Sequence, residues 1–285
     1  MTQETHSNLV DLDLDKIAGI FAELAVQAGA AIMQFYGTDA HAKAKPDQSP
    51  VCDADLAAET VILKGLKSAL QQFPVVSEEA VAAGNRPSKT GTFILVDPLD
   101  GTREFLKKNG EFTVNLALIV DEAPRAGVVY APAAARIWIA GETATTVSVS
   151  SGERLPPKEE RQSLHVRRAP ADGLVALASR SHCDAQTESF LAQLPVRERQ
   201  SAGSSLKFCR IAEGAADVYP RFGRTMEWDT AAGDAVLRRA GGIVNDAGGR
   251  GPLRYGKFGG GLANGPFVAW GDPAAAAAYT GAKMA

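Results

Sequence analysis

The sequence predicts a fold of mixed helices and sheets, antiparallel in its first half and alternating in its second. Three apolar runs, Thr113 to Val120, Ala126 to Tyr130 and Arg136 to Ala140, have the length and composition of strands in an antiparallel meander. Further along, expected strands at 174–178 and 243–244 alternate with helical patterns, which is typical of α/β architecture. With 285 residues, 45% of them hydrophobic, the chain can bury one large core or two lobes.

Two helices are expected before the meander. Apolar residues recur at helical spacing from Ile17 to Phe35, with Asp13 or Asp15 available as the N-cap and Gly37 at the end. A second helix is expected from about Asp53, which we interpret as its cap. Its expected apolar face consists of Leu56, Leu63, Leu66 and Leu70.

In the second half we expect three more helices, one that includes 188–194 and two at 204–213 and 229–240. Between the halves, residues 150–170 are charged and contain prolines, as is typical of a connecting segment. We therefore expect an N-terminal α+β lobe over residues 1–160 and a C-terminal α/β lobe over residues 161–285.

Composition excludes several classes of function. The formal net charge is -3, which is not the charge of a protein that binds nucleic acid polymers. Cys52, Cys183 and Cys209 are widely spaced without a CxxC pair, which argues against a disulfide framework or zinc site and fits a reducing cytosol. We see no signal peptide and no apolar stretch of transmembrane length, so we expect a cytoplasmic protein. The sequence leaves open both peripheral association with the inner membrane and the oligomeric state.

The strongest motif is Asp-Pro-Leu-Asp-Gly-Thr at 97–102, directly after the apolar run 93–96. Two carboxylates three positions apart in a tight turn suit a hard divalent cation. Gly101 allows close backbone approach, and N–H groups around Gly101 and Thr102 could hold a phosphate oxygen. The alternative is an ordinary β-turn with solvated acids, because Asp, Pro and Gly are common turn residues.

Three further acidic groups favour the metal interpretation. They lie at 53–55, 78–79 and 227–234, each at the end of an expected strand or the start of an expected helix. Solvated surface acids would more often alternate with Lys and Arg. Ligation by oxygen alone indicates Mg²⁺, with Mn²⁺ as a possible substitute.

These motifs resemble a known family. Ser-Glu-Glu at 77–79, the 97–102 motif and Trp-Asp-Thr-Ala-Ala-Gly at 228–233 resemble the motifs of the inositol monophosphatase superfamily of metal-dependent, lithium-sensitive phosphatases. A narrower resemblance, to its bacterial 3'(2'),5'-bisphosphate nucleotidase branch, rests on the stretches 103–106, 109–115, 179–182, 203–209 and 219–223. The resemblance runs from about Lys45 to Asn264, most of the chain.

The resemblance implies a layered α/β/α/β/α sandwich and a phosphatase reaction. The implied substrate is adenosine 3',5'-bisphosphate (PAP), hydrolysed at its 3'-phosphate to AMP and phosphate. The related phosphosulfate (PAPS) would be converted to adenosine 5'-phosphosulfate (APS), with a role in sulfur assimilation and nucleotide recycling. The implied cofactors are two or three Mg²⁺ ions, replaceable by Mn²⁺, and Li⁺ is expected to inhibit.

The resemblance also implies metal ligands. Glu78, Asp97 and the backbone carbonyl of Leu99 would hold the activating ion. Asp97, Asp100 and Asp229 would hold a second. Glu79 would be a neighbour of these ligands, and a surface acid is an equally weighted alternative for it.

Asp55 and Thr102 are the expected catalytic pair, which would position and deprotonate the attacking water. The second phosphate of a bisphosphate needs a cation away from the metals, and Lys207 could supply it, although a lysine on an amphipathic helix is more often solvated. Arg221 is open to the same two interpretations. The expected substrate-binding residues are Lys45, Glu78, Leu99, Asp100, Gly101, Thr102, Ser204, Lys207 and Asp229.

Two alternatives remain at this point. The nearer one is an inositol monophosphatase or another phosphatase of small phosphate esters. The other is a non-catalytic module that binds a cation or a phosphate. The presence of Thr102 and Asp55 disfavours the module, because binding alone does not need a pair that activates water.

Overall fold

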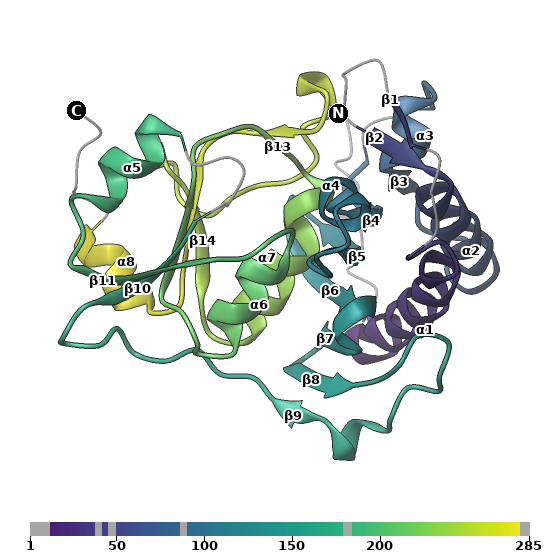
Figure 1. The fold of residues 1–285 in the computed structure, drawn as a ribbon, viewed down its shortest axis with the longest axis horizontal. Coiled ribbons are helices and arrows are strands. Elements are labelled where there is room, and N and C mark those ends of the chain that lie inside the picture. Colours follow the sequence, from purple (N-terminus) through teal and green to yellow (C-terminus); the bar gives the residue numbers. More distant parts are fainter. Residues whose placement is uncertain (1–11, 38–41, 45–49, 86–89, 179–183, 280–285) are drawn as a thin grey trace, which may run out of the picture.

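Two stacked β-sheets and the helices around them form the protein (Figure 1). The computed structural model describes residues 12–37, 42–44, 50–85, 90–178 and 184–279. Its helices are α1 (Leu14–Met33), α2 (Asp53–Ala69), α3 (Glu78–Ala82), α4 (Thr102–Leu106), α5 (Ala185–Leu191), α6 (Leu206–Ala212), α7 (Trp228–Arg239) and α8 (Pro273–Tyr279), with single 3₁₀ turns at Pro132–Ala134, Lys158–Glu160 and Phe258–Gly260.

The strands divide between two large sheets and two small pairs. The seven-stranded sheet has the order β3 (Val75–Ser77), β4 (Thr92–Asp100), β5 (Thr113–Val120), β6 (Ala123–Ala131), β7 (Arg136–Ala140), β8 (Ala144–Ser148) and β9 (Gln162–Ser163). The five-stranded sheet has the order β11 (Val196–Ser201), β10 (Leu174–Ala178), β12 (Val218–Arg221), β16 (Phe267–Trp270) and β14 (Ile243–Asp246). The small pairs are β1 (Ala42–Ala44) with β2 (Pro50–Cys52), and β13 (Thr225–Met226) with β15 (Ala263–Asn264).

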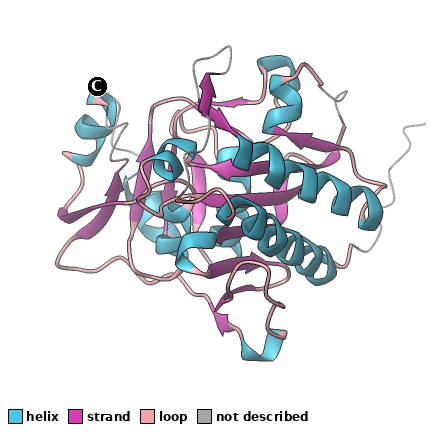
Figure 2. Cartoon of the chain, turned by 45° about the vertical axis from the view of Figure 1, so that its right-hand side comes forward, coloured by secondary structure: helices cyan, strands magenta, loops and turns pink. Residues whose placement is uncertain are grey.

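The layers follow the order helix, sheet, helix, sheet, helix. Helices α1 and α2 lie side by side over one face of the seven-stranded sheet, as Figures 1 and 2 show. Helices α6 and α7 lie between the two sheets, and α5 and α8 cover the outer face of the five-stranded sheet. The five-layered sandwich implied by the resemblance is therefore confirmed.

Alternation along β4 shows how the central layers are held. Phe93 and Leu95 join the core shared with α6, α7 and the second sheet, whereas Ile94 and Val96 join the core under α1 and α2. Successive side chains of a strand point to opposite faces, so an unbroken apolar run is what a sheet covered on both sides requires. This burial fixes the strand that ends in the 97–102 motif.

Helix α1 confirms the first expected helix and corrects one prediction. Asp13 is its N-cap, with the carboxylate accepting from Lys16 N at 2.9 Å. Asp15 instead accepts from Glu142 N, also at 2.9 Å. The helix is long and apolar enough to cross a membrane by length and composition, against the prediction that no stretch is. Its packing against α2 and the seven-stranded sheet marks it as a core helix, so the described structure gives membrane association no support.

Helix α2 starts at Asp53, but the cap is Cys52 and the reciprocal partner is Asp55. The interpretation of Asp53 as the cap was therefore wrong by one residue. The predicted apolar face was also half wrong: Leu56 is 50% exposed, and the buried positions of the helix are Ala54, Asp55, Ala58, Ile62 and Leu66. Small alanines pack closely under α1, and this close packing rather than leucine content selects the face.

Several of the remaining strands and helices match the predicted ones, and one strand that was missed lies at the edge of the five-stranded sheet. Strands β5 and β7 have their predicted bounds, and β6 is longer than predicted. Helix α5 includes the first part of the helical stretch predicted at 188–194 but ends at Leu191, and Asp184 caps its start by accepting from Thr187 N at 2.7 Å. Strand β11, Val-Arg-Glu-Arg-Gln-Ser, is mostly exposed at a sheet edge, so its polar sequence gave no strand signal.

The connection between the sheets is more structured than a linker. Within 150–170, a 3₁₀ turn precedes β9, which pairs with β8 and extends the seven-stranded sheet. The chain crosses to the second sheet only after Ser163. The division into lobes at 1–160 and 161–285 stays a prediction.

Candidate active site

A cavity of about 280 Å³ lies where the carboxyl end of β4 meets the starts of α3, α4, α6 and α7. Most of the predicted site residues line it, although they come from five separate segments. The lining comprises Glu78, Asp97, Leu99, Asp100, Gly101, Thr102, Arg103, Glu104, Ser204, Lys207, Phe208, Tyr219, Arg221, Thr225, Asp229 and Thr230.

The 97–102 turn has a geometry that its sequence requires. Strand β4 shifts register against β5 between Asp97 and Asp100, and Leu99 N donates to Asp97 Oδ1 at 3.1 Å. Gly101 then adopts a φ of +94°, in the left-handed region. A Cβ at this position would lie 2.2 Å from Ser204 Oγ, so only glycine fits. The turn thereby directs Thr102, the first residue of α4, into the cavity.

Asp55 and Thr102 lie in direct contact despite their separation in sequence. Thr102 Oγ1 donates to Asp55 Oδ1 at 3.1 Å, and Asp55 is only 2% exposed. The other carboxylate oxygen, Oδ2, accepts from both Cys52 N and Cys52 Sγ at 2.9 Å. Asp55 thus closes the start of α2 with one oxygen and orients the Thr102 hydroxyl with the other. Because that hydroxyl donates to Asp55, its lone pairs remain to accept a hydrogen bond from the cavity.

A polar network that sequence reasoning missed holds Asp100 and Asp229 together. Asp100 Oδ2 accepts from Ser205 N at 2.7 Å and lies 3.3 Å from Asn115 Nδ2. Ser205 Oγ lies 3.1 Å from the same oxygen and 2.8 Å from the Asp229 carbonyl oxygen. Asn115 and Ser205 belong to the stretches 109–115 and 203–209 that carry the narrower resemblance, which was the available signal.

The electrostatics of the cavity favour a bound cation. Burial raises the pKa of Asp229 well above its ordinary value, and the nearby charges of Asp100 and Glu78 raise it further. Burial also raises the pKa of Asp100, against the attraction of Lys207. A divalent cation would remove this repulsion between carboxylates, and carboxylate and carbonyl oxygens are the ligands that Mg²⁺ takes. The donor set therefore fits a magnesium ion.

The four acidic residues predicted as metal ligands all line the cavity. They are Glu78, Asp97, Asp100 and Asp229. Within the described ranges, however, no three acidic, His or Cys side chains converge closely enough to form one metal site. The assignment of each carboxylate to a first or second ion stays a prediction.

The start of α3 is supported by a residue that the sequence did not single out. Glu59, on α2, accepts from Ser77 Oγ and from Ala80 N, the latter at 3.2 Å. This contact fixes the turn from which Glu78 enters the cavity. Glu79 is 7% exposed, so the alternative of a surface acid is wrong, and its role beside the ligands stays a prediction.

Lys207 is buried rather than solvated. Its side chain is on α6, the residue is 5% exposed, and Nζ donates to Ala202 O at 3.0 Å and Ser204 O at 2.8 Å. Burial lowers the pKa of Lys207 to about 8, although the charge of Asp100 raises it. Arg221, from β12, lines the same cavity, and its charge also lowers the pKa of Lys207. The solvated alternative for Lys207 is therefore wrong.

Ser204 fixes the loop before α6 to the metal-binding turn. Its hydroxyl donates toward the carbonyl oxygens of Asp100 at 2.9 Å and Glu111 at 2.8 Å. Two expected contributors cannot be placed: Lys45 and the stretch 179–182 lie outside the described residues.

The chain is similar in sequence to one protein family and to named enzymes. A model of the inositol monophosphatase family matches residues 13–282. The 3'(2'),5'-bisphosphate nucleotidase CysQ of Escherichia coli strain K12 is 47% identical over 238 residues, 82% of this chain and 91% of that protein. The protein of the same name from Buchnera aphidicola is 41% identical over 243 residues, 85% of this chain and 87% of its own length.

Solved structures show the same relationship. CysQ from Bacteroides thetaiotaomicron superposes with a TM-score of 0.76 at 39% identity, covering 90% of this chain and 97% of that one. An inositol monophosphatase from Zymomonas mobilis has a TM-score of 0.74 at 23% identity, covering 95% and 98%. The second likeness bears on the fold alone.

Proposed function

The chain belongs to the inositol monophosphatase family, and from this premise we propose that it is a Mg²⁺-dependent 3'(2'),5'-bisphosphate nucleotidase. The proposed reaction removes the 3'-phosphate of adenosine 3',5'-bisphosphate, giving AMP and phosphate. The observation that carries the proposal is the Thr102–Asp55 hydrogen bond at the wall of a cavity lined by five carboxylates, four of them the proposed metal ligands. Binding alone would not need this pair, whereas hydrolysis needs a base beside the metal ligands.

The metal ligands are proposed from the donor set. Glu78, Asp97 and the Leu99 carbonyl would hold one Mg²⁺, and Asp97, Asp100 and Asp229 a second, with a third ion possible in this scheme. Bound Mg²⁺ would neutralise phosphoryl oxygens and lower the pKa of a bound water. Replacement by Mn²⁺ and inhibition by Li⁺ belong to the same proposal.

The chain's own residues would handle the proton and the phosphate. The Thr102 hydroxyl, which donates to Asp55, would accept a hydrogen bond from the attacking water and pass its proton toward the carboxylate. As the water oxygen bonds to phosphorus, the bond from phosphorus to the 3'-oxygen breaks. The 3'-oxygen leaves with the electron pair and takes a proton from solvent water, which gives the 3'-hydroxyl of AMP. The backbone around Gly101 and Thr102 would contact the phosphate.

Nucleotide selectivity is proposed to come from the cations of the same cavity. Lys207 and Arg221 line it together with the proposed metal ligands, so the metal ions would bind one phosphate of the substrate and these cations the second. The identity of 47% to an enzyme named for bisphosphates supports this choice over the inositol phosphatase alternative. Conversion of PAPS, a role in sulfur metabolism and a cytoplasmic location would follow from the same assignment.

Relative turnover tests the proposal. We expect kcat/KM for adenosine 3',5'-bisphosphate to exceed that for inositol 1-phosphate by at least about 10-fold, because an added charge-assisted contact is worth about 1.5–3 kcal/mol. The Lys207→Met variant should lose most of this preference while keeping turnover of inositol 1-phosphate. A wild-type preference for inositol 1-phosphate would establish the alternative function, and binding of both esters without turnover would indicate the non-catalytic module.

The preference should also depend on pH. With its pKa near 8, Lys207 is charged below that pH and loses its charge as the pH rises through it. The preference for the bisphosphate should therefore narrow between pH 7 and pH 9.5, two values that bracket this pKa. The matched control is Lys207→Met, whose ratio of kcat/KM values should stay flat over the same range. An equally steep profile in that variant would remove Lys207 from substrate selection.

A further inference from the structure

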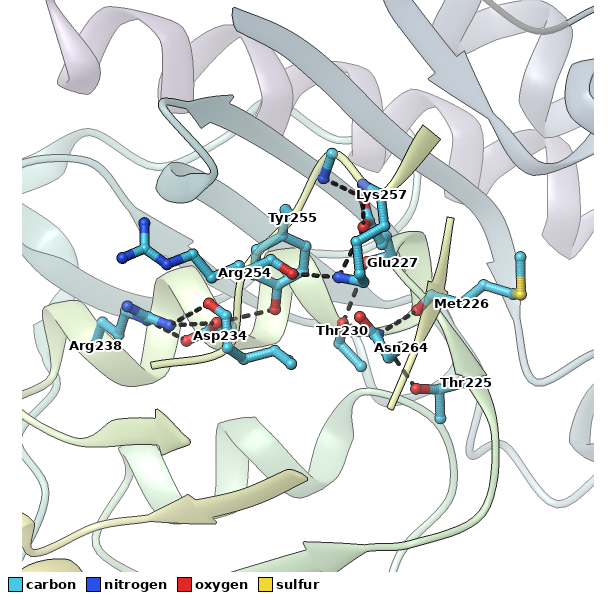
Figure 3. Close-up of polar contacts among 12 residues, drawn as sticks. Thr225, Met226, Glu227, Thr230, Asp234, Arg238, Arg254, Tyr255, Lys257 and Asn264 are labelled. Carbon is cyan, nitrogen blue, oxygen red and sulfur yellow. Dashed lines mark hydrogen bonds and ion pairs between the residues drawn. The ribbon is translucent and has the colours of Figure 1, made fainter. Parts of the chain in front are cut away.

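Glu227 is a fully buried carboxylate two residues before Asp229, and the metal and catalytic roles proposed above leave it without a function. Its carboxylate accepts from Gly256 N at 2.7 Å and Lys257 N at 2.9 Å, and it pairs with Lys257 Nζ at 2.8 Å (Figure 3). Through these hydrogen bonds and this ion pair, Glu227 holds the glycine-rich segment 254–264 against the start of α7. A fully buried carboxylate is rare in proteins unless it is paired, so the burial of Glu227 requires a structural explanation.

The other end of segment 254–264 is fastened to the same place. Strand β15 pairs with β13, and Glu227 N donates to Leu262 O at 2.9 Å. Asn264 Nδ2 lies 2.9 Å from Met226 O, 2.9 Å from Thr230 Oγ1 and 3.2 Å from Thr225 Oγ1. Figure 3 shows these side chains converging on the turn that leads into α7. Residues 225–230 are thus held from both ends of the segment.

The held turn touches Asp229 directly. Met226 N donates to Asp229 Oδ2 at 2.8 Å, which orients the carboxylate that faces the cavity. Met226 in turn lies between Asn264, which contacts its carbonyl, and Glu227, the next residue along the chain. Displacement of segment 254–264 would therefore be transmitted to the orientation of Asp229 through one residue.

We propose that Glu227 is a positioning residue for the metal site, acting through segment 254–264 and Met226 to aim Asp229. The inference rests on the proposed function, in which Asp229 is a magnesium ligand. Groups that orient a metal ligand from behind typically change metal affinity or activity by about 10–100-fold when they are altered. Glu227 acts through the backbone rather than by touching the ligand, so we expect the lower end of that range.

Glu227→Gln is the primary test, because it keeps the shape and replaces one acceptor oxygen with an NH₂ group. One of the three donors from Gly256 and Lys257 then loses its partner. We expect the calorimetric Kd for Mg²⁺, measured without substrate, to rise about 10-fold. The Mg²⁺ concentration for half-maximal phosphate release should rise by the same factor, while kcat at saturating Mg²⁺ stays within about threefold of wild type.

Asp217→Asn is the matched control for loss of a buried, paired carboxylate. Asp217 is also buried, pairs with Arg167 at 2.8 Å and accepts from Val175 N at 2.7 Å, and among the hydrogen bonds of the described residues its side chain contacts neither residues 225–230 nor segment 254–264. This variant should lower the melting temperature and leave the Mg²⁺ affinity unchanged. Equal weakening of Mg²⁺ binding in both variants would show a general effect of destabilisation and overturn the inference.

Asn264→Ala provides a second variant should Glu227→Gln not fold. The substitution removes the hydrogen bonds of Asn264 to residues 225–230, and we expect it to raise the Kd for Mg²⁺ as Glu227→Gln does. Wild-type Mg²⁺ affinity in either folded variant would overturn the positioning role. Failure of the proposed function has a different signature, namely wild-type protein that does not hydrolyse the bisphosphate, and Mg²⁺ calorimetry still decides the inference in that case.

Discussion

Asp97→Asn should abolish most turnover while leaving the fold intact. Asp97 is 1% exposed at the carboxyl end of β4, and the substitution removes a negative charge with almost no change in volume. The proposal places this carboxylate on both metal ions, where the charge stabilisation is worth several kcal/mol. We therefore expect kcat to fall by at least about 100-fold at saturating Mg²⁺, measured as phosphate release from adenosine 3',5'-bisphosphate.

Asp217→Asn is the control for burial of an acidic residue. Asp217 is also buried, but it pairs with Arg167 at 2.8 Å and does not line the cavity. This variant should lose stability and keep its turnover. If Asp97→Asn retained near wild-type turnover at limiting Mg²⁺, the assignment of Asp97 as a metal ligand would be refuted.

Asp55→Asn and Thr102→Ala should each lower kcat by at least about 100-fold, with a smaller effect on KM. General-base assistance is typically worth about 10²–10⁴-fold, and it acts mainly in the transition state. Because the 3.1 Å hydrogen bond makes the two residues one relay, the double variant should be little worse than the poorer single variant. Rates for both single variants and the double variant measure this coupling.

The structural alternative for the pair predicts a different outcome. Asp55 also closes the α2 capping box by accepting from Cys52 N through Oδ2, whereas Thr102 contacts the other oxygen of that carboxylate, Oδ1, and is not itself part of the box. If capping were the only role, Asp55→Asn would lower the melting temperature and Thr102→Ala would do little. Additive kinetic losses that follow the melting temperatures would remove the pair from the mechanism.

Local sequence predicted the parts of the fold whose two faces are both buried. The apolar runs of β4, β5 and β7 carry a strong strand signal because helices or a second sheet cover each side. Strand β11 could not be found in this way, since its Arg and Glu side chains are exposed and only pairing with β10 makes it a strand. The face of α2 was misjudged for a related reason, because its packing depends on alanines under α1.

The candidate site was predictable where its residues lie in short motifs. The 97–102 turn, Glu78 and Asp229 could be named because they lie in four acidic groups without interspersed Lys or Arg, and because their motifs resemble those of the family. The contacts that Glu59, Asn115, Ser205 and Glu227 make depend on segments that meet only in the folded chain, so local sequence does not predict these contacts. Asn115 and Ser205 lie in stretches of the narrower resemblance and Glu227 lies in the acidic group 227–234, which marked the residues but not their partners. Burial of Lys207 is likewise a tertiary property, set by the carbonyl oxygens of Ala202 and Ser204.

The most direct measurement is the product formed from adenosine 3',5'-bisphosphate, separated by chromatography after incubation with Mg²⁺ and, in parallel, with excess EDTA. We expect AMP and one equivalent of phosphate with Mg²⁺, and no phosphate with EDTA. The prediction follows from a cavity whose ligands are carboxylates that repel one another without a cation. Undiminished phosphate release in EDTA, or an intact bisphosphate after incubation with Mg²⁺, would contradict it.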